Sequence, residues 1–256
     1  MSETIELLQF PFSHYNEKVR WTLDYKRIAH VRINYLPGPH APQIKKLTGQ
    51  TAVPVVRTDG KVVAGSARII DMIERSHPSP PLYPADAADR EEALAIQQRF
   101  DDELGPAVRR LVFKALLDDE PDYIPRMFSV GKPEWKRALY RGMFPLVQGL
   151  LRKANGVTSE QVAVAEKTVE SLLDFIAGKT SRTGQMVGDG FTIADLTGAA
   201  LLAPMVAVTH PDMAKPEPLP KAARVLLQRY ERHPAVLWVH EQYRKHRPPS
   251  CGTVVA

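Results

Sequence analysis

Cysteine is nearly absent from this chain of 256 residues, since Cys251 is the only one. A disulfide within the chain is therefore impossible, and a metal site built on several thiolates is excluded. The eight histidines show no tight ligand spacing, so the sequence predicts no metal. A chain without disulfides suits a reducing compartment, and we expect a cytoplasmic protein.

Long hydrophobic runs are also missing. The longest nearly apolar stretch, residues 196–208, contains Gly198 and Pro204 and is too short to span a bilayer. We expect it to form a core helix, and we expect no membrane partner. The N-terminus lacks the basic and apolar pattern of a signal peptide.

A strong excess of one charge is missing too, because 34 Lys and Arg stand against 29 Asp and Glu, a net charge of +5. The positive charges are scattered and form no nucleic-acid motif, so we predict no nucleic-acid partner. The densest cluster, residues 244–247, ends a helical pattern, where its side chains can satisfy terminal carbonyl groups. The positive balance can also steer a small anion toward a cleft.

The composition changes at a proline-rich segment over residues 77–87. Strand and helix patterns alternate before it, and no convincing strand pattern follows it. This division predicts one domain over residues 1–82 and a second, all-helical domain over residues 83–256, with a loose tail from Pro248. The helices of the second domain are expected over residues 86–117 with a break near Gly105, 134–154, 159–176, 193–207, 219–232 and 235–245.

A strand-to-helix turn near the N-terminus carries the strongest functional signal. Residues 5–10 form an apolar run typical of a strand, and Tyr15, Val19 and Leu23 follow it with helical spacing. Ser13 therefore lies at or just before the first helical residue, where unpaired backbone N–H groups and the helix dipole favour an anion. Ser13 is either a simple N-cap or a hydroxyl that stabilises a bound thiolate.

Two later segments could hold the rest of a small peptide-like anion. Pro54 stands in an apolar run, where proline is tolerated at the first residue of a strand. If the Val53–Pro54 peptide is cis, the backbone of Val53 is free to pair with an extended peptide. Ser66 follows a strand and begins a helix with apolar spacing at Ile69 and Ile73, so this second helix start could hold a carboxylate.

These three motifs, in this order, resemble the thioredoxin-like N-terminal domain of the cytosolic glutathione transferase superfamily. Residues 1–82 fit its order β-α-β-α-β-β-α, and residues 187–196 resemble a capping-box segment typical of its C-terminal domain. The resemblance implies an α/β domain with a mixed four-stranded sheet, followed by an all-α domain. It also implies a homodimer that uses glutathione as co-substrate.

The resemblance implies that the sulfur of glutathione lies near Ser13. A free thiol has a pKa of about 8.5, and lowering it by roughly two units requires about 2.7 kcal/mol of preferential thiolate stabilisation. A hydroxyl hydrogen bond to a charged group supplies about 1.5–3 kcal/mol. A helix N-terminus adds about 0.3–1 kcal/mol, so the two together suffice without a metal.

Ser13 has rivals for this role. The resemblance aligns Ser13 and Asn16 with the two cysteines of the Cys-Pro-x-Cys motif of thiol-redox relatives, so a dithiol cycle is impossible at this motif. The Asn16 amide or the Tyr15 hydroxyl could face the sulfur instead, although Tyr15 also suits a core aromatic position. His14 could act as a general base.

For the remainder of glutathione, the resemblance implies that Val53–Pro54 pairs with the cysteinyl part and Ser66 holds the γ-glutamyl carboxylate. The family usually has an acidic residue directly before that serine, and Gly65 stands there instead. Asp101 or Asp102 of the predicted long helix, from this chain or a dimer partner, could replace it, or both could be solvated helix charges. The residues expected near the glycyl end are His40, Lys45 and Gln50.

The leading interpretation is a glutathione transferase that attacks an apolar electrophile bound between the domains, against residues such as Leu111, Phe113 and Met127. One alternative is a glutathione-dependent reductase or peroxidase that acts through the tripeptide's own sulfur. Another is a non-catalytic binding or interaction protein on the same scaffold, because a fold alone does not fix function. Gly65 and the missing thiols favour the non-catalytic alternative slightly.

Overall fold

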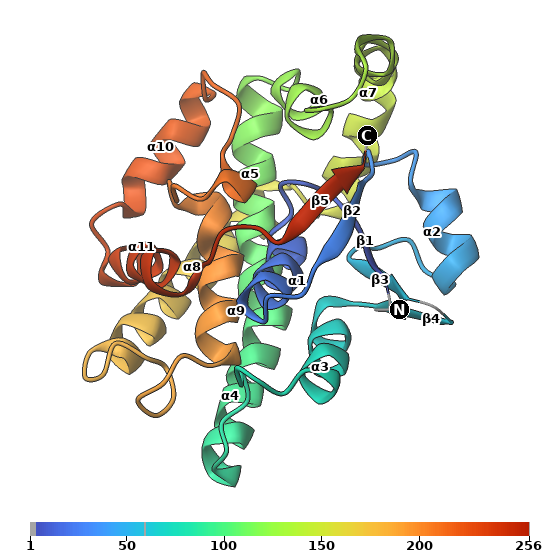
Figure 1. The fold of residues 1–256 in the computed structure, drawn as a ribbon. Helices are drawn as coiled ribbons and strands as arrows, with labels where there is room; N and C mark the ends of the chain where they lie inside the picture. The colour runs from blue at the N-terminus through green and yellow to red at the C-terminus, as the bar shows by residue number, and fades with distance from the viewer. Residues whose placement is uncertain (1–3, 59, 256) are drawn as a thin grey trace.

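The first part of the chain forms a mixed sheet with helices on both faces. The computed structural model describes residues 4–58 and 60–255. The predicted order β-α-β-α-β-β-α is confirmed (Figure 1), as β1 (Ile5–Gln9), α1 (His14–Tyr25), β2 (His30–Asn34), α2 (Ala41–Thr48), β3 (Val55–Thr58), β4 (Lys61–Ala64) and α3 (Ser66–Ser76). Strand β1 pairs in parallel with β2 and antiparallel with β3, and β3 pairs antiparallel with β4.

A fifth strand, β5 (Gly252–Val255), comes from the far end of the chain and lies in parallel against β2, beyond the four predicted strands. The sheet order is β4-β3-β1-β2-β5. The expectations of a loose tail and an all-helical remainder are therefore wrong at these residues (Figure 1). The Cys251 N–H donates to Asp24 Oδ1 over 2.7 Å and fixes the start of the strand. A four-residue strand held by such a long-range contact has too little local pattern to be predicted.

The residues between α3 and β5 are helical. The predicted break in the long helix is confirmed, because the π-helical turn η1 (Phe100–Leu104) separates α4 (Ala87–Arg99) from α5 (Gly105–Asp119). The short helix α6 (Tyr123–Phe128) follows where no element was expected. The others are α7 (Glu134–Ala154), α8 (Ser159–Thr180), α9 (Ile193–Leu202), the 3₁₀ turns η2 (Ala203–Met205) and η3 (Pro211–Met213), α10 (Lys221–Tyr230) and α11 (Pro234–His246).

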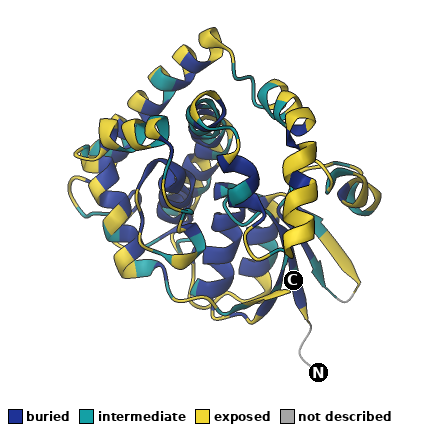
Figure 2. Cartoon of the chain, turned by 90° about the horizontal axis from the view of Figure 1, so that it is seen from above, coloured by how far each residue is buried: buried dark blue, intermediate teal, exposed yellow. Residues whose placement is uncertain are grey.

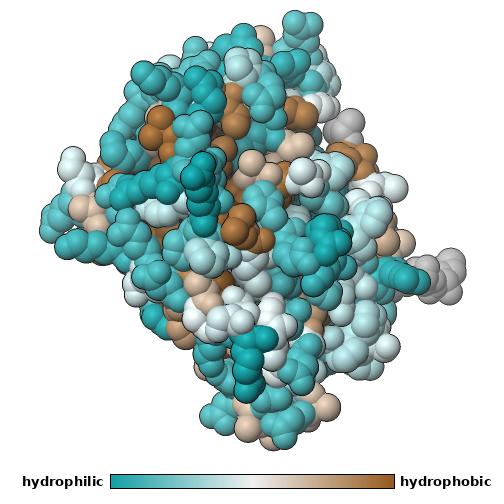
Figure 3. Space-filling view, turned by 90° about the vertical axis from the view of Figure 1, so that its left-hand side faces the viewer, coloured by the Kyte–Doolittle hydropathy of each residue, from teal (hydrophilic) through white to brown (hydrophobic). Residues whose placement is uncertain are grey.

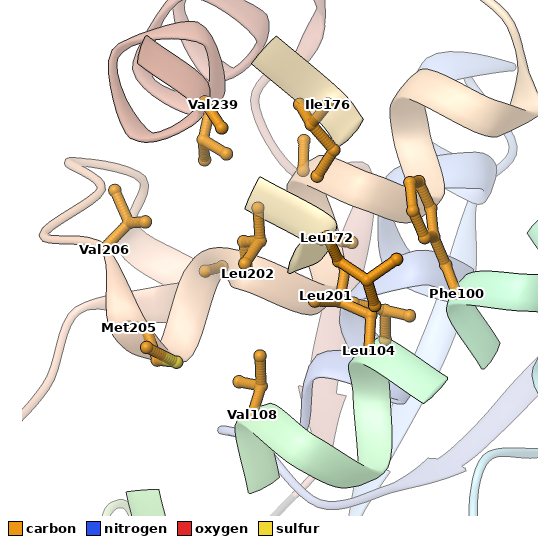
Figure 4. Packing of buried hydrophobic residues seen from close by; sticks show 14 of the residues in the cluster. Phe100, Leu104, Val108, Leu172, Ile176, Leu201, Leu202, Met205, Val206 and Val239 are labelled. Carbon is orange, nitrogen blue, oxygen red and sulfur yellow. The ribbon is translucent and has the colours of Figure 1, made fainter. Parts of the chain in front are cut away.

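The sheet and the helical part each have their own buried core (Figure 2). One face of the sheet packs Leu7 and Val56 against Val19 of α1 and Ile69 of α3. In the helical part α9 is buried along its whole length, and its Leu201 lies among side chains of the neighbouring helices (Figure 4). Full burial of one such apolar side chain is worth about 1.5–3 kcal/mol, so these two clusters dominate the stability of the fold.

The predicted capping box at the start of α9 is confirmed. Thr192 Oγ1 accepts a hydrogen bond from the Ala194 N–H, and the Asp195 carboxylate accepts one from the Thr192 N–H over 2.9 Å. The same carboxylate also accepts from the Met186 N–H over 2.8 Å. Burial raises the pKa of Asp195 to about 6, against the lowering effect of these hydrogen bonds. Asp195 therefore holds the turn before α9 as well as its first residues.

An ionic cluster lies buried where α1, β2, η3 and the end of α11 meet. Arg247, whose side chain is fully buried, contacts Glu17, Asp24 and Asp212 at distances of 2.7–2.8 Å. Arg20 and Arg32 complete a set in which three guanidinium groups face three carboxylates. We expected the basic residues at 244–247 to satisfy helix carbonyls, but Arg247 instead pairs with carboxylates, because the fold brings them together from distant segments.

The surface over α10 and α11 is mainly hydrophilic, and hydrophobic atoms show there only in small separate patches (Figure 3). Within residues 4–58 and 60–255, no helix combines the length and the apolar character that crossing a bilayer requires.

Candidate functional site

The strand register brings the three predicted segments to one edge of the sheet. Leu8 of β1 lies opposite Val55 of antiparallel β3, so the turn after β1 and the segment before β3 lie at the same end. Val55 in turn lies opposite Ala64 of β4. The Gly65 N–H then donates to the Pro54 carbonyl over 3.1 Å, which places the start of α3 beside this segment.

Ser13 occupies the N-cap position of α1 with extended backbone angles, φ −83° and ψ 128°. Its side chain nevertheless makes no capping hydrogen bond. Ser13 is half-buried and lines a cavity of about 240 Å³ at the sheet edge. Its hydroxyl therefore lies beside the free N–H groups of a helix start and is not used to cap them.

Tyr15 lines the same cavity, but its hydroxyl has a structural partner. The Tyr15 Oη donates to the Asp101 carbonyl over 2.6 Å, where η1 crosses α1. Burial raises the pKa of Tyr15 far above its usual range. A Cβ at position 105 would lie 2.2 Å from the Tyr15 Oη, so only glycine permits this close approach of α5.

His14 is buried, and its Nε2 lies 3.1 Å from the Gly105 carbonyl. A carbonyl only accepts, so Nε2 carries the proton and Nδ1 keeps its lone pair. Burial and the charge of Arg109 lower the pKa of His14 to about 3. The imidazole is therefore neutral at pH 7, and it lines the cavity beside Ser13.

Asn16 is placed differently from the other residues of the motif. Its side chain is 0% exposed and is absent from the lining of the cavity. Its amide nitrogen and oxygen have no hydrogen-bond partner among the described residues. The structure thus separates Asn16 from Ser13, and an interior amide is less suited to meet a ligand in the cavity.

The Val53–Pro54 peptide is cis, and Val53 lines the cavity opposite the Ser13 turn. Outside the regular elements, the backbone hydrogen bonds of the described residues include none made by Val53. The Gln50 side chain makes two hydrogen bonds to the backbone of Ala52: its Nε2 donates to the carbonyl, and its Oε1 accepts from the N–H. His40 donates from Nε2 to the Thr51 carbonyl over 2.9 Å. In this structure Gln50 and His40 position the segment that leads to Val53.

Gly65 and Ser66 form the start of α3, where Gly65 has φ +94° and Ser66 is buried. Neither residue lines the cavity that contains Ser13. Both oxygens of Asp101, a candidate for the role of the missing acidic residue, accept from Lys18 Nζ over 2.6 and 2.8 Å. Asp102 is exposed and accepts from Gln98, and Lys45 is exposed on α2. A role for these residues in binding glutathione stays a prediction.

The cavity has mostly apolar walls. Phe113 and Met127 line it as predicted, whereas Leu111 faces the helical core and does not. A smaller chamber of about 50 Å³ adjoins it and shares Phe12 and Val112. Further apolar side chains of the larger chamber come from the turn after β1 and from α5, α6 and α7, among them Phe10, Leu116, Phe128 and Leu151.

Two cations in these chambers were not predicted. Arg109 lines the larger chamber, and its guanidinium lies 5.9 Å from the centre of the Tyr15 ring. Lys215 lines the smaller chamber, and burial lowers the pKa of its amine to about 8. The helical spacing of Arg109 from Val112 and Leu116 could have placed it on the cavity face of α5. Lys215 lies in an irregular loop that offers no such pattern.

No metal site accompanies this cavity in the part of the chain that the structure describes. No group of three or more His, Cys, Asp and Glu side chains is arranged to hold a metal ion there.

The mixed sheet, with the strand-to-helix turn at its edge, has the arrangement of a thioredoxin-like domain. A bundle of helices follows it. A family model described as "Glutathione S-transferase, N-terminal domain" matches residues 7–81. Maleylacetoacetate isomerase of Dictyostelium discoideum is 26% identical over 144 residues, which cover 54% of this chain. The chain spans 63% of the length of that relative.

Solved structures agree in fold. The beta-etherase of Sphingobium sp. is 20% identical with a TM-score of 0.60, covering 93% of this chain and 99% of the other. A theta class glutathione S-transferase from Xanthomonas axonopodis pv. citri, with glutathione bound, is 16% identical with a TM-score of 0.55, covering 91% and 94%. Residues 7–81 therefore match the N-terminal domain of glutathione S-transferases, and the whole chain shares its fold with these solved structures.

Proposed function

We propose that this protein is a glutathione transferase in which Ser13 stabilises the thiolate of bound glutathione. The thiolate attacks an electrophile held in the cavity between the sheet edge and helices α5, α6 and α7. The observation that carries the proposal is the free hydroxyl of Ser13, which lines that cavity at the start of α1 without capping the helix.

The neighbouring side chains support Ser13 over its rivals. The Tyr15 hydroxyl donates to the Asp101 carbonyl, and Asn16 lies outside the cavity lining. The pKa of His14 is lowered to about 3 by burial and by Arg109, so a proton taken from a thiol would be held weakly there. An uncommitted hydroxyl next to unpaired helix N–H groups is the best donor that remains for a thiolate.

Two segments at the same sheet edge offer partners for the rest of glutathione. The Val53 backbone could pair with the cysteinyl part, since no other bond outside the regular elements engages it among the described residues. Ser66 at the start of α3 could hold the γ-glutamyl carboxylate. The relative from Xanthomonas axonopodis pv. citri, solved with glutathione bound, supports glutathione as the co-substrate.

One observation favours a second candidate, a non-catalytic protein that has lost tight glutathione binding. Gly65 offers no carboxylate to the γ-glutamyl ammonium, and the Asp101 carboxylate is paired with Lys18. Retention of the protein on immobilised glutathione separates the two candidates, because a transferase is retained and is eluted by free glutathione.

Ser13→Ala tests the proposed role of the hydroxyl. We expect turnover with glutathione and a generic aryl halide to fall at least about tenfold, since a hydrogen bond to a charged group contributes about 1.5–3 kcal/mol. The melting temperature should hardly change, because the hydroxyl makes no cap. Ser76→Ala is the matched control, as its exposed hydroxyl bonds the carbonyls of its own helix and the His77 ring and does not line the cavity. Full activity of Ser13→Ala would refute the role of Ser13.

A further inference from the structure

Arg109 is a partly buried cation that has no carboxylate partner among the residues that the structure describes. It lies on α5 and lines the larger chamber beside Ser13, His14 and Tyr15. Its guanidinium contacts the Tyr15 ring, and no carboxylate within residues 4–58 and 60–255 forms an ion pair with it. Burial lowers the pKa of Arg109, and the nearby charge of Arg110 adds to this effect.

The guanidinium groups that are more deeply buried than Arg109 have carboxylate partners. Arg20, Arg32 and Arg247 each contact at least one carboxylate within 3.0 Å. Removing a charge from water without a partner is costly, and buried cations are normally paired. Since no described carboxylate pairs with Arg109, its charge points to an anion that enters with a ligand.

The surroundings of Arg109 offer no negative charge to such a ligand. None of the described residues that line the two chambers is acidic, and Lys215 contributes a second cation in the smaller one. The chambers share Phe12, Val112 and Leu116 in their walls, so they lie next to each other. Both are lined mainly by apolar side chains, and each has one Arg or Lys among its described lining residues.

The position of Arg109 on its helix fixes which part of a ligand it would meet. Arg109, Val112, Phe113 and Leu116 have the spacing i, i+3, i+4 and i+7, so they share one face of α5. On this face of α5, the apolar side chains are therefore followed by the Arg109 guanidinium, which lies toward His14. An aromatic or aliphatic body can lie along the wall while an anionic group meets Arg109.

We propose that the electrophile conjugated by this protein is an apolar compound that carries a carboxylate, and that Arg109 binds this carboxylate. The inference rests on the proposed transferase function and names its class of acceptor. Arg109 is a substrate-binding residue in this account, since a guanidinium can hold a carboxylate through two parallel hydrogen bonds.

The anion that Arg109 meets could also be the glutathione thiolate, and the structure favours the carboxylate. The thiolate already has Ser13 and the start of α1, whereas the acceptor wall on α5 has Arg109 as its only polar member among the described lining residues of that helix. The two sources are separated by measuring the pKa of the bound thiol as well as acceptor selectivity.

The test compares 4-chloro-3-nitrobenzoate with the neutral 4-chloro-3-nitrobenzamide. In both reactions the glutathione sulfur bonds to the ring carbon that carries chlorine, chloride leaves, and the thiol proton passes to solvent. Each kcat/KM is divided by the rate constant of the uncatalysed reaction with glutathione, because the two rings differ in intrinsic reactivity. The variants are Arg109→Gln, Arg109→Lys and Lys114→Gln, the last as a control at an exposed ion pair of the same helix.

The wild type should prefer the benzoate by about tenfold or more, the usual effect of one charge-assisted pair. Arg109→Gln should abolish this preference, so that the normalised kcat/KM values of the two compounds become equal. Arg109→Lys should keep part of the preference, and Lys114→Gln should behave as the wild type. A wild type without preference, or an Arg109→Gln variant that loses both reactions equally and raises the pKa of the bound thiol, would overturn the proposal.

A binding measurement keeps this result separate from failure of the transferase function. Calorimetry with unreactive 4-nitrobenzoate, in the absence of glutathione, needs no turnover. We expect binding to the wild type, and an affinity at least about tenfold weaker for Arg109→Gln. Equal affinity of both proteins would refute the carboxylate site, whereas absent turnover with intact binding would refute only the transferase reaction.

Discussion

Arg247→Met should destabilise the fold strongly, because Arg247 is the shared partner of the buried ionic cluster. Its guanidinium contacts Glu17, Asp24 and Asp212, and its side chain is fully buried. The cluster has three positive and three negative groups, so removal of Arg247 leaves one uncompensated negative charge. Breaking a buried ion pair in this way costs about 3–5 kcal/mol.

That cost is a large part of the total stability of a folded domain, which is about 5–15 kcal/mol. The assay is urea and thermal unfolding followed by circular dichroism, and the melting temperature should fall by about 6 °C or more at 2–4 °C per kcal/mol. Arg244→Met is the matched control, because Arg244 is exposed and pairs with Glu241 on the same helix. It should cost less than about 1 kcal/mol.

The same variant predicts a change in pH dependence. Burial alone would raise the pKa of Asp212, but the charges of Arg20, Arg32 and Arg247 outweigh it and lower the pKa to about 2. In the wild type this carboxylate stabilises the fold above its unfolded pKa of about 3.9, and the stabilisation is lost as the pH falls toward 2. Without Arg247 the buried carboxylates take up protons at higher pH, which relieves the excess negative charge.

The difference in unfolding free energy between wild type and Arg247→Met should therefore narrow between pH 7 and about pH 4. A constant difference over this range would show that lost packing, rather than charge, causes the destabilisation. A loss no greater than that of Arg244→Met would refute the cluster as a stabilising element.

Two further substitutions test the hydrogen bond of Tyr15 and the capping box of Asp195. Tyr15→Phe removes the donor to the Asp101 carbonyl and should cost about 1–3 kcal/mol in urea unfolding, while the pKa of bound glutathione stays the same. A raised thiol pKa in this variant would assign the sulfur to Tyr15 instead. Asp195→Ala removes the acceptor of the Met186 and Thr192 N–H groups and should cost about 2 kcal/mol or more. Asp195→Asn should lose less, and an unchanged melting temperature for Asp195→Ala would contradict the placement of this residue.

The elements that the sequence predicts well are those with strong local patterns. The bounds of α7 and the capping box before α9 follow from periodicity and from Thr192 and Asp195. The strand β5 and the short helix α6 could not be predicted in this way, because they depend on contacts with distant residues. Cys251, for example, is held by Asp24, which lies more than 200 positions earlier in the chain.

In the candidate site, too, the features set by local sequence could be predicted and those set by distant contacts could not. The turn at Ser13 and the Val53–Pro54 segment could be recognised from local sequence, but the directions of Tyr15 and Asn16 could not. They depend on the contact of α1 with η1 and Gly105, which places the Tyr15 hydroxyl on a backbone carbonyl. Arg109 was not predicted from the sequence, because the lack of a carboxylate partner among the described residues becomes apparent only in the structure.

The pKa of the thiol of bound glutathione tests the proposed mechanism most directly. It is measured from thiolate absorbance against pH, in the wild type and in Ser13→Ala at saturating glutathione. We predict a midpoint about two units below the free value of about 8.5 in the wild type, and a rise of at least about one unit in Ser13→Ala. The same midpoint in both proteins would contradict it, since Ser13 would then contribute nothing to the thiolate.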